Sequence, residues 1–208
     1  MAKKNKNKDT NSRRRRGSGT RTTSKPILLF VQGECTEKDY FKLLRSRLRL
    51  QSLTIITESQ SPENLVEQTK TTISREDDAP FSAIYYVVDV DETSDEQFRQ
   101  AFKAAKDATN RKTEYHFVVS HESFEAWLLA HFEDIRNKNI PRKTMGKKLQ
   151  GGERLNGKRV SDNFPVEDYE QAVEQVTHCA FDEVNRETTS TAMPHLITEL
   201  IKLKPKPR

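Results

Sequence analysis

A short turn after the first apolar run of the chain carries the side chains best suited to chemistry. The run, ILLFV at residues 27–31, is followed by Gln32, Gly33 and Glu34 and, where a helical pattern starts, by Glu37. Oxygen ligands placed just beyond a buried strand are typical of a site for a hard cation. Acids in a first helical turn also complement the helix dipole. The turn therefore predicts either a metal site or an ordinary helix start.

Two further acids, Asp89 and Asp91, end a second apolar run, AIYYVVDVD. Strand alternation points both side chains to the same side. With one acid from the first turn they would form an oxygen-rich site for Mg²⁺ or Mn²⁺, and such an ion polarises a phosphodiester and lowers the pKa of a bound water. The alternatives are a solvated acidic loop in DVDETSDE and a variant capping box made by Thr36 and Asp39.

The elements that must position these acids alternate between strands and helices. Four strands separated by helices predict an α/β domain of Rossmann-like topology, a mostly parallel four-stranded sheet flanked by helices, over residues 26–208. Ligands of such sheets gather beyond the carboxyl ends of the strands. We expect strands at 26–31, 53–57, 83–89 and 115–119, and helices at 37–50, 62–74, 95–110, 122–133, 166–181 and 195–203.

The segment ESFEAWLLAHFE reads as a strongly apolar helix. Phe124, Trp127, Leu128 and His131 fall on one stripe, which is more typical of core than of a site. Glu125 faces elsewhere, in the first turn after a strand end, where it could reach the metal cluster or cap the helix.

The charge of the chain is unevenly distributed. Residues 1–25 carry ten Lys or Arg and one Asp, whereas the rest has 26 basic and 30 acidic residues. Because this leader has almost no apolar side chain, we expect it to be disordered. It is either a phosphate-binding arm, which gains affinity by releasing counterions, or a solubilising tail. The contiguous arginines that favour the arm are Arg13, Arg14, Arg15 and Arg16.

A second basic region, residues 138–165, is Gly-rich and predicts a long surface insertion. It is either a loop that contacts nucleic acid or a partner, or a plain solvated loop. GGERLNGK has the Walker A spacing, but Arg159 replaces the required Ser or Thr, so we expect no ATP site. The charges of the insertion are Arg142, Lys143, Lys147, Lys148, Arg154, Lys158 and Arg159.

Composition limits the setting of the protein. No apolar run approaches the length of a membrane span, the basic N-terminus lacks the apolar core of a secretory signal, and Cys35 and Cys179 form neither a CxxC pair nor a disulfide framework. We therefore expect a cytoplasmic protein with no membrane association.

Several of these motifs resemble the RloB-like family. ILLFVQGECTEKDYFKLLR resembles its opening EGExTE turn, YYVVDVDE its DxD strand, SHESFEAWLLAHFE its S-N-P-x-F-E-x-W-L-L-x-H-F motif, and NRETTSTAMPHLITEL, more weakly, its closing segment. The family is similar to Toprim nucleases found with ATPase partners in bacterial restriction and anti-phage loci. The resemblance implies a Toprim fold, a Mg²⁺-dependent nuclease, and an RloA-like partner of the ABC or AAA type. RNA, and tRNA in particular, is preferred over DNA by analogy alone.

The resemblance also assigns roles to residues. Asp89 and Asp91 would bind the metal, with Glu37 or Glu34 as auxiliary ligand or base, while the family's first Glu falls on Gln32. Glutamine keeps an acceptor oxygen but cannot take a proton.

Three explanations of this glutamine stay open: an engineered Glu→Gln substitution, a natural pseudo-enzyme, or a carboxylate supplied by Glu34 or Glu37. The function expected is metal-dependent cleavage of nucleic acid. The alternative is a non-catalytic subunit that binds nucleic acid or regulates the ATPase.

Overall fold

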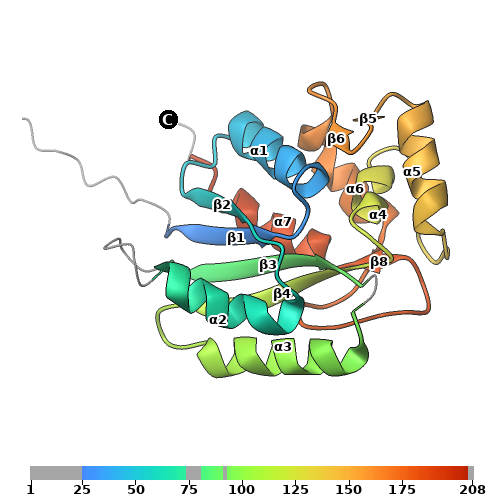
Figure 1. Cartoon of the computed structure of the whole chain (residues 1–208). Coiled ribbons are helices and arrows are strands. Elements are labelled where there is room, and N and C mark those ends of the chain that lie inside the picture. The colour runs from blue at the N-terminus through green and yellow to red at the C-terminus, as the bar shows by residue number, and fades with distance from the viewer. Residues whose placement is uncertain (1–24, 74–80, 91–92, 206–208) are drawn as a thin grey trace, which may run out of the picture.

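The computed structural model describes residues 25–73, 81–90 and 93–205. Within them, helices cover both faces of one central sheet (Figure 1). Residues 1–24, which include the four arginines of the leader, and one acid of the DxD motif, Asp91, fall outside the described residues, so the expectations for them stay predictions.

The sheet has six strands in the order β2-β1-β3-β4-β8-β7. The four strands expected from the sequence are parallel neighbours, which confirms a mostly parallel sheet. Two short strands extend it, β8 antiparallel to β4 and β7 parallel to β8. The bounds are β1 Ile27–Val31, β2 Leu53–Thr57, β3 Ala83–Asp89, β4 Glu114–His121, β7 Thr177–His178 and β8 Ser190–Thr191.

Strand alternation divides the core into two layers, because successive side chains of a strand point to opposite faces. Leu29 and Val31 of β1 join the layer that contains α1 (Thr36–Leu48) and α7 (Met193–Ile201). Leu28 and Phe30 join the layer that contains α2 (Pro62–Ile73) and α3 (Asp95–Ala108). Apolar side chains on both faces explain why these strands read as continuous apolar runs.

The start of α1 differs from the capping-box alternative. Thr36 lies inside the helix, and the N-cap residue Cys35 makes no side-chain cap bond. The Thr36 hydroxyl instead donates to the carbonyl of Lys158, 2.7 Å away. A complete capping box does occur at α3, between Ser94 and Gln97.

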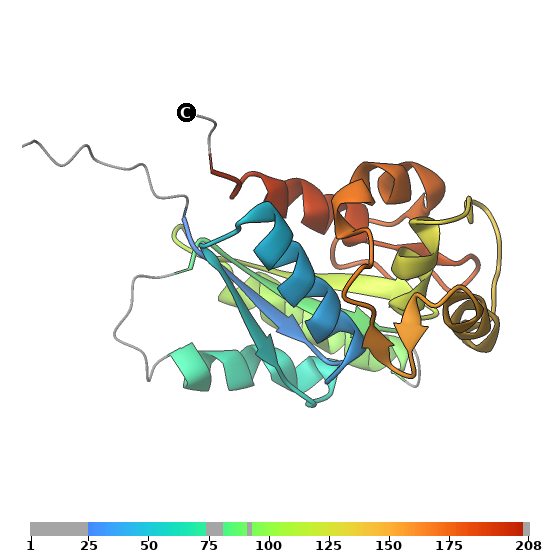
Figure 2. The same cartoon turned by 90° about the horizontal axis from the view of Figure 1, so that it is seen from above.

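The basic region 138–165 is folded rather than a plain solvated loop. It contains the helix α5 (Arg142–Gly151) and a hairpin of β5 (Leu155–Asn156) and β6 (Arg159–Val160). The expectation of a surface insertion overlooked its widely spaced apolar residues, which are buried in the layer of α1: Ile140, Met145, Leu149, Leu155, Val160 and Phe164. Figure 2 shows α4 (Glu125–Ala130), α5 and the hairpin beside the end toward which the parallel strands point.

The C-terminal helices differ from the expected bounds. The turn η1 (Val166–Asp168) and helix α6 (Tyr169–Gln175) replace the predicted helix 166–181, since the chain is extended at Val176 and then enters β7. Helix α7 starts two residues before the predicted His195. Within the described ranges, no helix combines the length and apolar character that crossing a membrane requires.

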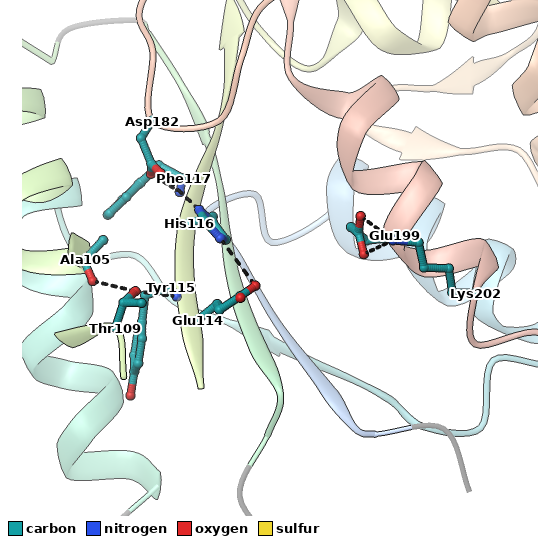
Figure 3. A network of polar contacts seen from close by, with 9 residues as sticks. All are labelled: Ala105, Thr109, Glu114, Tyr115, His116, Phe117, Asp182, Glu199 and Lys202. Carbon is teal, nitrogen blue, oxygen red and sulfur yellow. Dashed lines mark hydrogen bonds and ion pairs between the residues drawn. The ribbon is translucent and has the colours of Figure 1, made fainter. Parts of the chain in front are cut away.

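The loop between β7 and β8 is fastened to β4 by Asp182. Its carboxylate accepts the Phe117 N–H at 2.7 Å and lies 3.0 Å from Nδ1 of His116, as Figure 3 shows. The His116 ring stacks on Tyr85 and on Phe181, with ring centroids 5.8 and 5.1 Å away, and these two rings also contact each other. The hydrogen bond to Asp182 raises the pKa of His116, and the charges of Asp182 and Glu114 act in the same direction against burial.

This contact makes stability depend on pH. The pKa of His116 is raised in the folded chain, so the charged pair stabilises the fold fully below about pH 6.5, the ordinary histidine value. The contribution is lost as pH rises through the folded pKa. We expect Asp182→Asn to lower the free energy of unfolding by about 1 kcal/mol more near pH 6 than near pH 9, measured by urea unfolding.

A matched control is Asp162→Asn, which makes the same charge change at an exposed position. Its effect should be small at both pH values. An Asp182→Asn deficit that is equal at both pH values would show that the pair does not titrate as stated.

Candidate active site

Three carboxylates gather at the carboxyl end of the parallel sheet. Glu37 lies in the first turn of α1, Asp89 is the last residue of β3, and Glu125 is the first residue of α4. Glu37 is 9% exposed, and the side chains of Asp89 and Glu125 are 14% and 16% exposed. We call these three residues the acid cluster. Like charges held this close in a poorly solvated place disfavour one another's ionisation.

Asp89 is held by the chain that follows β4. Its Oδ1 accepts the backbone N–H of Phe124 at 2.9 Å, which ties the end of β3 to the start of α4. Burial raises the pKa of Asp89 well above its usual range, and the charges of Glu37 and Glu125 raise it further. Arg142 and the Phe124 N–H oppose this shift. Asp89 therefore has a strong need for a cation when it is ionised.

Glu37 folds back over the preceding glycine. A Cβ built on Gly33 would lie 1.5 Å from Oε2 of Glu37, so only glycine leaves room for the carboxylate in this position. Burial raises the pKa of Glu37, as does the charge of Glu125, while its own backbone N–H, Arg142 and Lys158 lower it. The glycine of the turn thus has a positional role, because it lets Glu37 reach the acid cluster.

Cations from the basic region stand beside the acids. Arg142, the first residue of α5, places Nη2 3.7 Å from Oδ2 of Asp89 and Nε 3.8 Å from Oε2 of Glu125. Its backbone N–H donates to Glu122 at 2.5 Å. Lys158 of the hairpin acts on Glu37 through its charge. The acid cluster is therefore partly neutralised by the segment that the sequence suggested as an insertion.

The acid cluster has the donor chemistry of a Mg²⁺ or Mn²⁺ site but not its geometry. Hard cations take carboxylate oxygens, and the acids at this site repel one another. Yet, across the residues that the structure describes, no three His, Cys, Asp or Glu side chains are placed to hold one ion. Arg142 contacts two of the three acids, and Asp91, the fourth predicted ligand, lies outside the described residues. Among the described residues, Glu37, Asp89 and Glu125 supply the right donor atoms for such an ion, although their side chains are not placed around one.

Two other residues predicted for the site have different surroundings from the acid cluster. The Gln32 amide donates to the backbone carbonyl of Gln60 at 3.0 Å, in the loop between β2 and α2. Glu34 is exposed, whereas Glu37 is buried. Of the two acids offered as a replacement for the family's first Glu, Glu37 is the one that lies beside Asp89.

The basic residues predicted to bind nucleic acid have different surroundings. Lys147, Lys158 and Arg159 are exposed, although Arg159 lies 3.5 Å from Asp39. Lys148 forms an ion pair with Glu133, 2.5 Å apart. The Arg154 guanidinium lies 4.4 Å from the centre of the Phe132 ring. The hairpin tip and the first turn of α5 thus present the cations nearest to the acid cluster.

Sequence reasoning missed the close relation of Arg142 to the acids. It treated Arg142 as one charge among seven in a surface segment, because no periodic pattern links residue 142 to residue 89. No local pattern in the sequence singles out Arg142 among these charges.

The position of Glu37 over Gly33 leads to a test. We expect Gly33→Ala to push the Glu37 carboxylate out of the acid cluster, because the new methyl group would occupy its place. The pKa of Glu37 should then fall toward the ordinary carboxyl range, as burial and Glu125 no longer raise it. Carboxyl-detected NMR titration measures this pKa.

Gly146→Ala is the matched control, since a Cβ at this site in α5 meets nothing within 4 Å. It should leave the pKa of Glu37 unchanged and stabilise the helix by about 0.5–1 kcal/mol. If Gly33→Ala left the Glu37 pKa raised, the carboxylate would not depend on the glycine.

Comparison with known proteins shows to which family the chain belongs. The model of one protein family, described as RloB-like protein, matches residues 27–200, which include every described acid of the cluster. Neither the curated proteins nor the solved structures contain a match to the chain. The match spans most of the chain, from the first strand to the last helix, and the chain therefore belongs to the RloB-like protein family.

Proposed function

We propose that this chain is a metal-dependent nuclease that cleaves phosphodiester bonds of nucleic acid. The observation that carries the proposal is the acid cluster, three poorly exposed carboxylates at the carboxyl end of a parallel sheet with Arg142 and Lys158 beside them. Ligand sites of such sheets occur at this end, and perturbed carboxyl pKa values cluster at functional sites. The Toprim arrangement of the site is part of this proposal.

Each acid has a role in the proposed reaction. Asp89 and Glu37, with Glu125 and Asp91, would hold Mg²⁺ or Mn²⁺, which supplies charge stabilisation to the phosphodiester and an activated water. If it does not bind the ion, Glu37 is instead the candidate proton acceptor, because a carboxyl group with a raised pKa accepts protons better near neutral pH. The buried N–H bond from Phe124 keeps Asp89 oriented.

The substrate class rests on charge. The exposed cations of α5 and the hairpin lie next to the acids, where the phosphates of a nucleic acid would pass. A groove of about 500 Å³ between α1 and the hairpin is lined by charges of both signs, Lys42 and Arg159 together with Asp39 and Asp162. RNA such as tRNA as the preferred substrate over DNA, an RloA-like ATPase partner of the ABC or AAA type, and a role in anti-phage defence rest on the family resemblance alone.

A second candidate function is a non-catalytic subunit that binds nucleic acid or regulates the ATPase. Two observations favour it. The amide of Gln32 is engaged with Gln60 rather than with an acid of the cluster, and Arg142 contacts Asp89 and Glu125.

The decisive test is cleavage of labelled tRNA, unstructured RNA and DNA with Mg²⁺ or Mn²⁺, with and without the partner ATPase. We expect Glu37→Gln and Asp89→Asn to lower the rate by about 10²-fold or more, since they remove a proton acceptor or a ligand. Glu34→Gln is the matched control, as it makes the same change three residues away at an exposed position. It should keep the wild-type rate.

The substitution Gln32→Glu tests the position of the family's first Glu. A carboxylate cannot donate to the Gln60 carbonyl, so the new side chain is released from that contact, and we expect tighter metal binding and faster cleavage. Adding Asp89→Asn should abolish this gain. If neither wild type nor Gln32→Glu cleaves any substrate, the non-catalytic function is favoured.

The basic leader gives a separate prediction. Removal of residues 1–25, which carry nine net positive charges, should weaken nucleic-acid binding and flatten its dependence on salt, because fewer counterions are released. Filter binding over a series of salt concentrations measures both effects. Equal affinity of the full and shortened chains at low salt would rule out a binding arm.

A further inference from the structure

Arg142 contacts two poorly exposed acids, although its own side chain is about half exposed. Its guanidinium lies 3.7 Å from Asp89 and 3.8 Å from Glu125, yet 46% of its side chain is exposed. Strong arginine–carboxylate pairs are bidentate and have N–O distances of about 2.7–2.9 Å. The contacts of Arg142 with these two acids are longer than these distances.

The backbone of Arg142 is held in place. Its N–H donates to Glu122 at 2.5 Å, and Met145 and Leu149 bury the inner face of α5. Withdrawal of the guanidinium from the acids would therefore require a rotation of the Arg142 side chain and no movement of the helix.

The acids need a cation whether or not a metal ion is present. Burial and mutual repulsion act on the acid cluster, and Arg142 favours ionisation of both Glu37 and Asp89. A divalent ion carries twice the charge of a guanidinium and would bind the same oxygens. The guanidinium and the ion therefore compete for the same carboxylate oxygens.

We propose that Arg142 is an exchangeable counter-cation of the acid cluster, which covers the carboxylates until a divalent ion replaces it and then turns outward to bind a phosphate of the nucleic acid. The proposal rests on the proposed function and extends it to the regulation of the same site. It explains why the acid cluster has the oxygen donors of a metal site but not the arrangement of one. Two of its carboxylates, those of Asp89 and Glu125, contact a guanidinium.

The outward position suits a phosphate. A guanidinium has a planar fork of donors that matches phosphate oxygens. Lys147 is exposed on the same helix, and Lys158 is exposed on the adjacent hairpin. Metal entry would in this way switch Arg142 from the acids to the substrate, so that substrate binding is strengthened only at a loaded site.

The test is a calorimetric titration of Mn²⁺ into the full chain. We expect Arg142→Gln to tighten Mn²⁺ binding by about tenfold or more, because the competing charge is gone. Arg142→Lys keeps the charge and should stay closer to wild type. Arg111→Gln, the same change at an exposed position before β4 and at the opposite end of the sheet, is the matched control and should leave the affinity unchanged.

A second measurement tests whether the Arg142 side chain contacts a phosphate when a divalent ion is bound. With Mn²⁺ present, Arg142→Gln should weaken binding of a short RNA and reduce the slope of log affinity against log salt by about one, as expected for one lost phosphate contact. Without divalent ions, the same substitution should have a smaller effect on RNA binding, since Arg142 then faces the acids.

These outcomes separate the inference from the proposed function. Tighter Mn²⁺ binding by Arg142→Gln supports the inference even if no substrate is cleaved. Cleavage that depends on Asp89, together with equal Mn²⁺ affinities of wild type and Arg142→Gln, overturns the inference and leaves the nuclease intact. Absence of Mn²⁺ binding in both proteins overturns the inference as well.

Discussion

The electrostatic cost of holding three carboxylates together is the constraint on which the rest of this structure depends. Isolated buried charges are expensive, and like charges raise the cost. The chain limits this cost by adding cations from a distant segment, with Arg142 contacting Asp89 and Glu125 and the charge of Lys158 acting on Glu37. The folded basic region is therefore part of the site, because without it the acids at the strand ends would have no such partners.

The same constraint explains several local features. Gly33 leaves room for the Glu37 carboxylate, and the Phe124 N–H fixes Asp89. Thr36 bonds to the hairpin carbonyl of Lys158 instead of capping its own helix, which brings the basic hairpin to the acids. Two hydrogen bonds between segments far apart in the sequence thus stabilise one arrangement. A site assembled in this way is sensitive to single substitutions that leave the sheet itself intact.

The central sheet and the acid cluster impose different requirements. The sheet is stabilised by apolar side chains on both faces, which is a large and non-directional contribution. The acid cluster opposes folding whenever its charges lack partners. Such a destabilising contribution is typical of functional sites, whose residues are arranged for function rather than for stability. The His116–Asp182 contact lies toward the amino-terminal end of β4, and its charges are paired, so it stabilises the fold.

The sequence by itself determined the four parallel strands, their flanking helices and the meeting of Asp89 with the turn after β1, because these follow from apolar periodicity and from the direction of parallel strands. The two short strands β7 and β8 have too few residues to form a pattern. Only the tertiary structure decided that Glu37 rather than Glu34 faces the acids, that Gln32 turns to Gln60, and that Arg142 closes the cluster. The physical reason is that side-chain direction in turns, and pairing across a hundred residues, depend on which segments the core brings together.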